Sequence, residues 1–240
     1  MNFRRFAGKM LSGWYIVRSK IHPSFSQAGE DQIIRYLFEL LKITNPTYLD
    51  IGTNHPFIGN NSYYFYMRGA KGVCVEPDPF FYPLIKKNRP RDVVIQAGVN
   101  IGSMEKADLY IFPHPYSGWN TFLKEEAEKR AKETGIAIEK TQSIPLVHIN
   151  DLLRQYFHPH PNLLSIDVEG LDLAILKSID FALYKPECIC AESITFSMTN
   201  QEIKVNEIID FLNSKGYFLF ADTHINSIFC RSDVYKKKKE

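Results

Sequence analysis

The chain has 240 residues, of which 45% are hydrophobic and 23% charged, values that exclude disordered, collagen-like and coiled-coil proteins. A chain of this length predicts one domain with a sizeable buried core. The net charge of +2 is too small to indicate a nucleic-acid partner, and none is expected. No apolar run reaches the roughly 18 residues that a membrane-spanning helix needs.

The cysteines also limit the class of protein. Cys74, Cys188, Cys190 and Cys230 lie in or beside apolar, strand-like runs and lack the paired CxxC spacing of zinc sites. We therefore predict buried free thiols in a reducing compartment and expect a cytoplasmic protein.

The first 24 residues mix five Arg and Lys residues with aromatic ones. They lack the continuous apolar core and the cleavage site of a signal peptide, so we predict a helical extension over 1–24. This extension could make weak contact with a membrane surface, but packing on its own domain is favoured. One domain is then expected over 25–235, followed by a solvated basic tail over 236–240.

Within this domain, helices and strands are expected to alternate as in an α/β fold. Apolar residues at helical spacing predict a helix over 30–42, and a short apolar run predicts a buried strand over 47–51. Further helices are expected at 62–67, 149–156, 171–178 and 201–214. Further strands are expected at 72–75, 92–97, 107–112, 144–147, 163–166, 187–191, 218–221 and 227–229. The result would be a doubly wound, mostly parallel sheet, with the last two strands as an antiparallel hairpin at its edge.

The pattern breaks over 113–143, where an aromatic loop precedes a charged stretch that is polar nearly all round. This predicts a lid-like insertion. Ser117, Trp119 and Asn120 offer an aromatic platform and polar groups of the kind that hold a sugar ring, so Trp119 and Asn120 are candidate substrate contacts. Trp119 could equally anchor the loop to the core.

Acidic residues follow the first two predicted strands, where a doubly wound fold binds a nucleoside-containing cofactor. Asp50 and Gly52 stand where the first strand ends, and Glu76 closes the second, the position from which a carboxylate accepts both ribose hydroxyls. Only the first glycine of the usual pattern is present, because Asn54 and Pro56 occupy later glycine positions. A pyrophosphate cradle is therefore unsupported, whereas S-adenosylmethionine needs none.

The block SIDVEGLDLAIL, residues 165–176, places more carboxylates after a predicted strand. Methylating a hydroxyl requires removal of its proton near neutral pH, by a carboxylate or His or with the help of a divalent ion. Asp167 or Glu169 could act in either way, although residue spacing does not support a metal site. Glu169 and Asp172 could instead merely favour a helix N-terminus.

Histidines offer fewer candidates. His55, in the predicted cofactor loop, is either a base on the acceptor side or an anchor of that loop. His224 precedes an edge strand and could face the pocket as a substrate contact. His158 and His160 flank a proline and are expected to be exposed turn residues rather than metal ligands.

Four blocks resemble the FkbM family of S-adenosylmethionine-dependent methyltransferases. They are FSQAGEDQIIRYLF, YLDIGTNHPFIGNNSYYFYMRGAKGVCVEPDP, NLLSIDVEGLDLAILKSID and an edge region ending NSIFCR, and together they span 25–231. The resemblance implies a Rossmann-like methyltransferase domain over 25–235 and O-methylation of a sugar, a glycan or a secondary-metabolite hydroxyl. It does not name the acceptor.

The resemblance also implies roles for residues. The N-terminal segment would cover the cofactor through Gln27 and Asp31, although Ser26 and Glu30 beside them could simply cap a helix. The family often has Glu where this chain has Asp172, so the role of that position stays open. The full set of expected cofactor contacts is Gln27, Asp31, Asp50, Gly52, Asn54, Glu76 and Asp78.

Two other functions remain open at this point. A nicotinamide-dependent oxidoreductase would also use an acidic end of the second strand, but the missing glycines argue against it. A non-catalytic module that binds a glycan or nucleotide would keep the fold without turnover.

Overall fold

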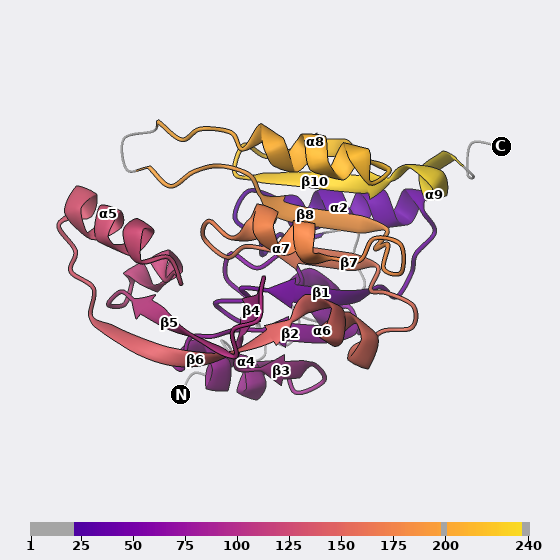
Figure 1. Cartoon of the computed structure of the whole chain (residues 1–240). Helices are drawn as coiled ribbons and strands as arrows, with labels where there is room; N and C mark the ends of the chain where they lie inside the picture. The colour runs from indigo at the N-terminus through magenta and orange to yellow at the C-terminus, as the bar shows by residue number, and fades with distance from the viewer. Residues whose placement is uncertain (1–21, 198–200, 237–240) are drawn as a thin grey trace.

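The computed structural model describes residues 22–197 and 201–236 (Figure 1). The extension predicted over 1–24 falls mostly outside these residues, as does the basic tail after Lys236. Within the described part of the chain, no helix is long and apolar enough to cross a membrane.

A sheet of seven strands forms the centre of the molecule, in the order β3-β2-β1-β7-β8-β10-β9. The strands are β3 (Val93–Ile95), β2 (Lys71–Val75), β1 (Thr47–Ile51), β7 (Leu163–Ile166), β8 (Cys188–Glu192), β10 (Asn226–Arg231) and β9 (Tyr217–Asp222). The first five are parallel, and β10 runs antiparallel to both of its neighbours. The predicted doubly wound, Rossmann-like fold with an antiparallel hairpin is confirmed.

Helices cover both faces of this sheet (Figure 1). One face packs on α6 (Ile149–Tyr156), α7 (Asp172–Ser178) and α8 (Asn206–Ser214). The other packs on α2 (Glu30–Leu40), α3 (Tyr63–Met67) and α4 (Phe81–Asn88). A short α9 (Ser232–Lys236) follows β10. Strands covered on both faces bury nearly all of their side chains, which explains why most residues of β1 and β7 are apolar.

All four cysteines are free and buried, as predicted, on the face beneath α2, α3 and α4. Strand alternation decides which side chains share that face. Tyr48 packs there, whereas Leu49 and Ile51 belong to the core beneath α6, α7 and α8.

The middle of the chain forms a second sheet, in the order β4-β6-β5. Its strands are β4 (Gly98–Asn100), β5 (Lys106–Ile111) and β6 (Lys140–His148). A 3-10 helix, η1 (Tyr116–Trp119), and α5 (Lys124–Thr134) connect β5 to β6. In the view of Figure 1 the insertion extends to one side of the central sheet.

Several predicted boundaries differ from the structure. The strand expected over 92–97 is shorter, because β3 ends at Ile95, and β4, which begins at Gly98, belongs to the other sheet. Strand β6 begins at Lys140, inside the predicted insertion, because its first residues pair with β5 and expose polar side chains. Helix α4 was not anticipated. Helix α8 begins at Asn206 rather than residue 201, because Ile194 and Lys204 form a β-bridge before it.

Candidate active site

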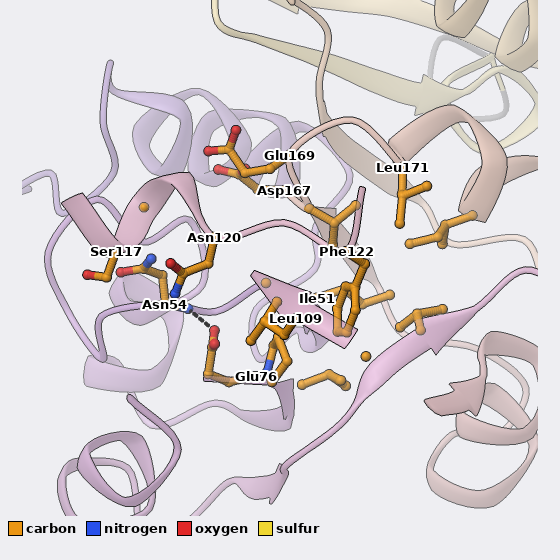
Figure 2. A pocket seen from close by; sticks show the side chains of 18 of the residues that line it. Ile51, Asn54, Glu76, Leu109, Ser117, Asn120, Phe122, Asp167, Glu169 and Leu171 are labelled. Atoms are coloured by element: carbon orange, nitrogen blue, oxygen red, sulfur yellow. Dashed lines mark hydrogen bonds between the residues drawn. The ribbon is translucent and has the colours of Figure 1, made fainter. Parts of the chain in front are cut away.

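A cavity of about 280 Å³ lies at the carboxyl ends of β1, β2 and β7. Strand β1 is the switch point of the sheet, since β2 lies on one side of it and β7 on the other, and doubly wound folds bind ligands at such a point. Figure 2 shows Glu76 and Asn54 on one side, Asp167 and Glu169 together on another, and Phe122 among apolar side chains. The apolar part of the lining is Ile51, Ile58, Val75, Pro77, Ala97, Val99, Leu109, Phe122, Val168, Leu171 and Ile175.

The first loop is shaped by close packing between strands. Gly52 has φ +78°, and a Cβ at this position would lie 1.8 Å from the carbonyl oxygen of Asp167. Only glycine therefore lets β1 pass the end of β7. Asn54 also has a positive φ, and its backbone N–H donates to Glu76 Oε2 at 2.6 Å.

Glu76 lines the cavity as predicted and is only 4% exposed. Its Oε1 accepts the Asp78 backbone N–H at 2.8 Å, so both carboxylate oxygens are held by the backbone. Burial raises the pKa of Glu76 to about 8, although these two hydrogen bonds oppose the shift. The carboxylate is thus oriented and desolvated at the edge of the cavity.

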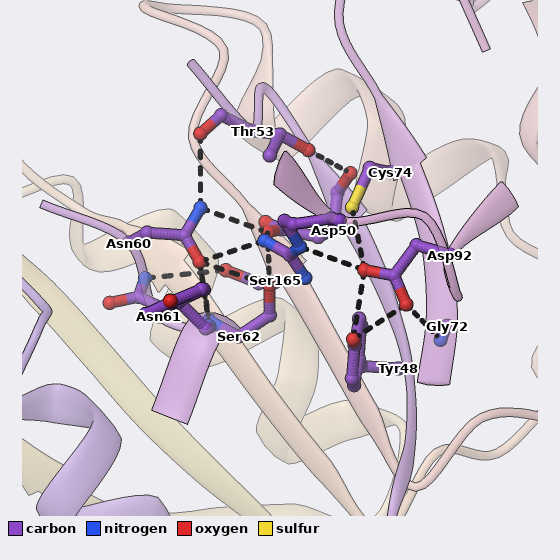
Figure 3. A network of polar contacts seen from close by, with 12 residues as sticks. Tyr48, Asp50, Thr53, Asn60, Asn61, Ser62, Gly72, Cys74, Asp92 and Ser165 are labelled. Atoms are coloured by element: carbon purple, nitrogen blue, oxygen red, sulfur yellow. Dashed lines mark hydrogen bonds and ion pairs between the residues drawn. The ribbon is translucent and has the colours of Figure 1, made fainter. Parts of the chain in front are cut away.

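Asp50 does not line the cavity. Its carboxylate points into a buried network on the other face of β1, where it accepts hydrogen bonds from Ser62 Oγ and Asn60 Nδ2 (Figure 3). The guanidinium of Arg89, which is 0% exposed, lies 3.9 Å from Asp50 and 2.7 Å from Asp92. The structure shows Asp50 as a support of the loop, and shows no direct path from its carboxylate to a ligand. Sequence reasoning missed Arg89.

Asp78 and Asn120 are bonded to each other. Asp78 Oδ2 accepts from Asn120 Nδ2 at 2.8 Å, and its Oδ1 accepts the Phe80 backbone N–H at the start of α4. Asn120 lines the cavity, but its Oδ1 accepts the Phe112 N–H, so its whole amide is engaged within the chain. This pair fastens the insertion to the loop after β2.

Trp119 does not line the cavity. Its ring stacks on Tyr116 at a centroid distance of 4.7 Å and meets Phe112 and Phe196 edge to face. The geometry matches the anchoring alternative for Trp119.

Carboxylates from two strand ends and a loop converge beside the cavity. Asp167 and Glu169 line it, and Glu192, at the end of β8, brings a carboxylate oxygen within 4.8 Å of theirs. These three oxygens are close enough to share a cation. Sequence reasoning missed Glu192. The signal that could have found it is the one that identified Glu76, an acidic residue at the carboxyl end of a predicted parallel strand. Asp172 is buried and accepts the Val168 and Gly170 N–H groups, which supports the turn.

One cation balances this cluster. Arg130, on α5, is 2% exposed, and its Nη2 lies 2.9 Å from Glu169 Oε2. Burial nevertheless raises the pKa of Glu169 above its usual value. Burial, together with repulsion from Asp167 and then Glu169, also raises the pKa of Glu192. Arg130 Nη1 also donates to the Trp119 carbonyl at 2.8 Å. The insertion thus reaches the site through Arg130.

The N-terminal segment contributes one of its two predicted contact residues to the cavity lining. Gln27 lines the cavity, whereas Asp31 is buried below it and accepts hydrogen bonds from Ser24 Oγ and the Phe25 N–H, both at 2.7 Å. Asp31 therefore positions the segment that carries Gln27. Glu30, beside it, accepts from Thr223 and Asn226 and links α2 to the last hairpin.

The histidines lie away from the cavity. His55 Nδ1 accepts the Ile58 N–H at 3.1 Å, which matches the loop-anchor alternative, and burial lowers its pKa. His224 is exposed in the turn between β9 and β10 and does not line the cavity. His158 is exposed as predicted, but His160 is half-buried, with its Nε2 3.3 Å from Glu187.

The Methyltransferase FkbM domain model matches residues 50–219, more than half of the chain. The chain belongs to the FkbM methyltransferase family, and the enzyme is a methyltransferase. No match was found among curated proteins.

Solved structures similar to this one include proteins described as methyltransferases. Methyltransferase FkbM from Methylobacillus flagellatus KT is 13% identical, with a TM-score of 0.43, and the match covers 78% of this chain and 43% of that one. The TehB-like SAM-dependent methyltransferase from Corynebacterium glutamicum is 9% identical, with a TM-score of 0.43 and coverage of 96% and 100%. The O-methyltransferase from Bacillus cereus, in complex with SAH, is 10% identical, with a TM-score of 0.43 and coverage of 92% and 88%. The chain thus spans less than half the length of the M. flagellatus protein.

Proposed function

We propose that the protein uses S-adenosylmethionine to methylate a hydroxyl group of a small molecule or glycan. The charge of the cavity carries this proposal. Among the described residues that line it, Glu76, Asp167 and Glu169 are acidic and none is Lys, Arg or His. Such a lining offers no cation to the pyrophosphate of a nicotinamide dinucleotide, whereas the positively charged sulfonium and ammonium groups of S-adenosylmethionine need none.

The lining residues fit the cofactor. Glu76 would accept the ribose hydroxyls, and the apolar lining around Phe122 and Leu171 would enclose the adenine. Gln27 would cover the cofactor from the N-terminal segment.

When bound, S-adenosylmethionine supplies an electrophilic methyl group on a positively charged sulfur. Asp167 lines the cavity, and its carboxylate accepts no hydrogen bond from the described residues, so it is available to take the proton of an acceptor hydroxyl. The electron pair of the O–H bond would remain on the acceptor oxygen, and Asp167 would hold the proton. Positioning by the rigid strand ends supplies the rest of the effect.

Two measurements test this proposal. Calorimetry with S-adenosylhomocysteine should show micromolar binding that Glu76→Ala abolishes and Asp167→Asn preserves. Transfer of labelled methyl from S-adenosylmethionine to a panel of glycans and small alcohols should then fall at least 100-fold in Asp167→Asn, and stay unchanged in the control Asp151→Asn, at an exposed position of α6. Absence of cofactor binding contradicts the proposal. Cofactor binding without transfer by the natural protein supports the non-catalytic module instead.

A further inference from the structure

The carboxylates of Asp167 and Glu192 have no hydrogen-bond partner in the described part of the chain. Both are half-buried, and each lies at the carboxyl end of a central strand, β7 for one and β8 for the other. Their oxygens lie within 4.8 Å of each other. Partly buried acceptors without donors are costly unless a ligand provides the donors.

A second observation concerns Arg130. Its two terminal nitrogens bind Glu169 and the Trp119 carbonyl, and its plane lies over the Phe196 ring at 4.7 Å. Its Nε is buried and has no partner among the described residues. This donor without an acceptor belongs to the guanidinium that binds Glu169, one of the three clustered carboxylates.

The two observations restrict what can bind. An anion could use Arg130 but would be repelled by three carboxylates, and an ammonium group could use the carboxylates but offers nothing to Arg130 Nε. A hydroxyl group both donates and accepts. Because the Asp167 and Glu192 carboxylates lie this close together, each can accept a hydrogen bond from one of two adjacent hydroxyl groups on the same ligand.

We propose that Glu192 is a specificity-determining residue of the acceptor site, where it and Asp167 accept hydrogen bonds from two adjacent hydroxyl groups of an uncharged acceptor. This inference rests on the proposed function. Glu192 is not among the residues that line the cavity, but its carboxylate lies within 4.8 Å of that of Asp167, which does line it. Arg130 holds Glu169 to the insertion and leaves Asp167 and Glu192 for the acceptor.

The test uses the full chain saturated with S-adenosylhomocysteine. Saturation-transfer NMR is recorded with glucose, galactose, mannose and rhamnose, which present adjacent hydroxyls in different arrangements, and with the anion glucuronate. We expect at least one neutral sugar to bind and glucuronate to be rejected. Glu192→Gln should weaken that binding at least tenfold without changing the affinity for S-adenosylhomocysteine, whereas Glu128→Gln, on the exposed side of α5, should leave both unchanged.

Three results would overturn the inference: no neutral sugar binds, glucuronate binds as well as glucose, or Glu192→Gln leaves sugar binding unchanged. Magnesium chloride titrated by calorimetry provides a further arm. Micromolar magnesium binding that Glu192→Gln abolishes, with no effect on sugars, would make the cluster a cation site instead. Failure of S-adenosylhomocysteine to bind the natural protein would count against the proposed function. That result is distinct from cofactor binding without sugar binding, which counts against the role of Glu192 alone.

Discussion

Glu76→Gln is expected to abolish the pH dependence of adenosine binding. Glu76 is 4% exposed, and burial raises the pKa of its carboxyl from 4.5 to about 8, despite hydrogen bonds from the backbone N–H groups of Asp78 and Asn54. The carboxyl is therefore mostly neutral at pH 7 and mostly ionised at pH 9. Ribose hydroxyls are donors, so they bind the ionised form more strongly.

The pKa sets the size of the effect. One unit below and one unit above a pKa of 8, about one tenth and about nine tenths of the carboxyls are ionised. If only the ionised form binds ribose, the apparent Kd for adenosine falls about tenfold between pH 7 and 9. The same shift affects stability, because the folded state binds this proton more tightly than the unfolded one. The contribution of the protonated Glu76 carboxyl to the free energy of unfolding is complete below about pH 4.5. It is lost as pH rises through about 8.

Adenosine is the ligand of choice because it has no group that titrates in this range, unlike the α-amino group of the cofactor. Calorimetry at pH 7, 8 and 9 would compare the natural protein with Glu76→Gln and with Glu187→Gln. Glu187 is a matched control because its carboxyl stays ionised from pH 7 to 9. Burial raises its pKa, but hydrogen bonds from His160 and Asn162 outweigh burial and hold the pKa below the usual value. A flat profile in the natural protein, or a tenfold slope retained in Glu76→Gln, would refute the reasoning.

Three further substitutions test other parts of the structure. Gly52→Ala should lower Tm and weaken S-adenosylhomocysteine binding, because the new Cβ would lie 1.8 Å from the Asp167 carbonyl oxygen; an unchanged Tm in differential scanning calorimetry would contradict this. Arg89→Met should lower the free energy of unfolding, measured in urea, by about 3 to 5 kcal/mol, because it leaves the buried Asp92 carboxylate without its cation. A loss under about 1 kcal/mol would argue against a buried ion pair. Phe122→Ala should weaken adenosine binding about tenfold, since it removes roughly 1.5 kcal/mol of apolar contact, and should change ribose binding little. Equal losses for adenosine and ribose would place the adenine elsewhere.

Much of the fold could be predicted from the sequence, because buried segments show an apolar pattern in their own residues. Strands β1 and β7 and helix α6 occupy the predicted residues, since the two strands are mostly apolar and the apolar residues of the helix recur at helical spacing. Glu76 and Asp167 were found by the same logic, because a polar residue directly after a buried parallel strand must lie at its carboxyl edge. Strands β5 and β6 were harder to delimit, since one face of each is exposed and their polar residues resemble a loop.

The sequence by itself determined the order of strands and helices, the acidic strand ends and the family. Only the tertiary structure decided which of those side chains share a cavity. Asp50 and Ile51 are neighbours in sequence but lie on opposite faces of β1, so Ile51 lines the cavity while Asp50 joins Arg89 in the core. Glu192 and Arg130 are distant from Asp167 in sequence and approach it only through the pairing of β8 with β7 and the docking of α5. Periodicity records which side of an element is buried, and the packing of distant segments decides what it is buried against.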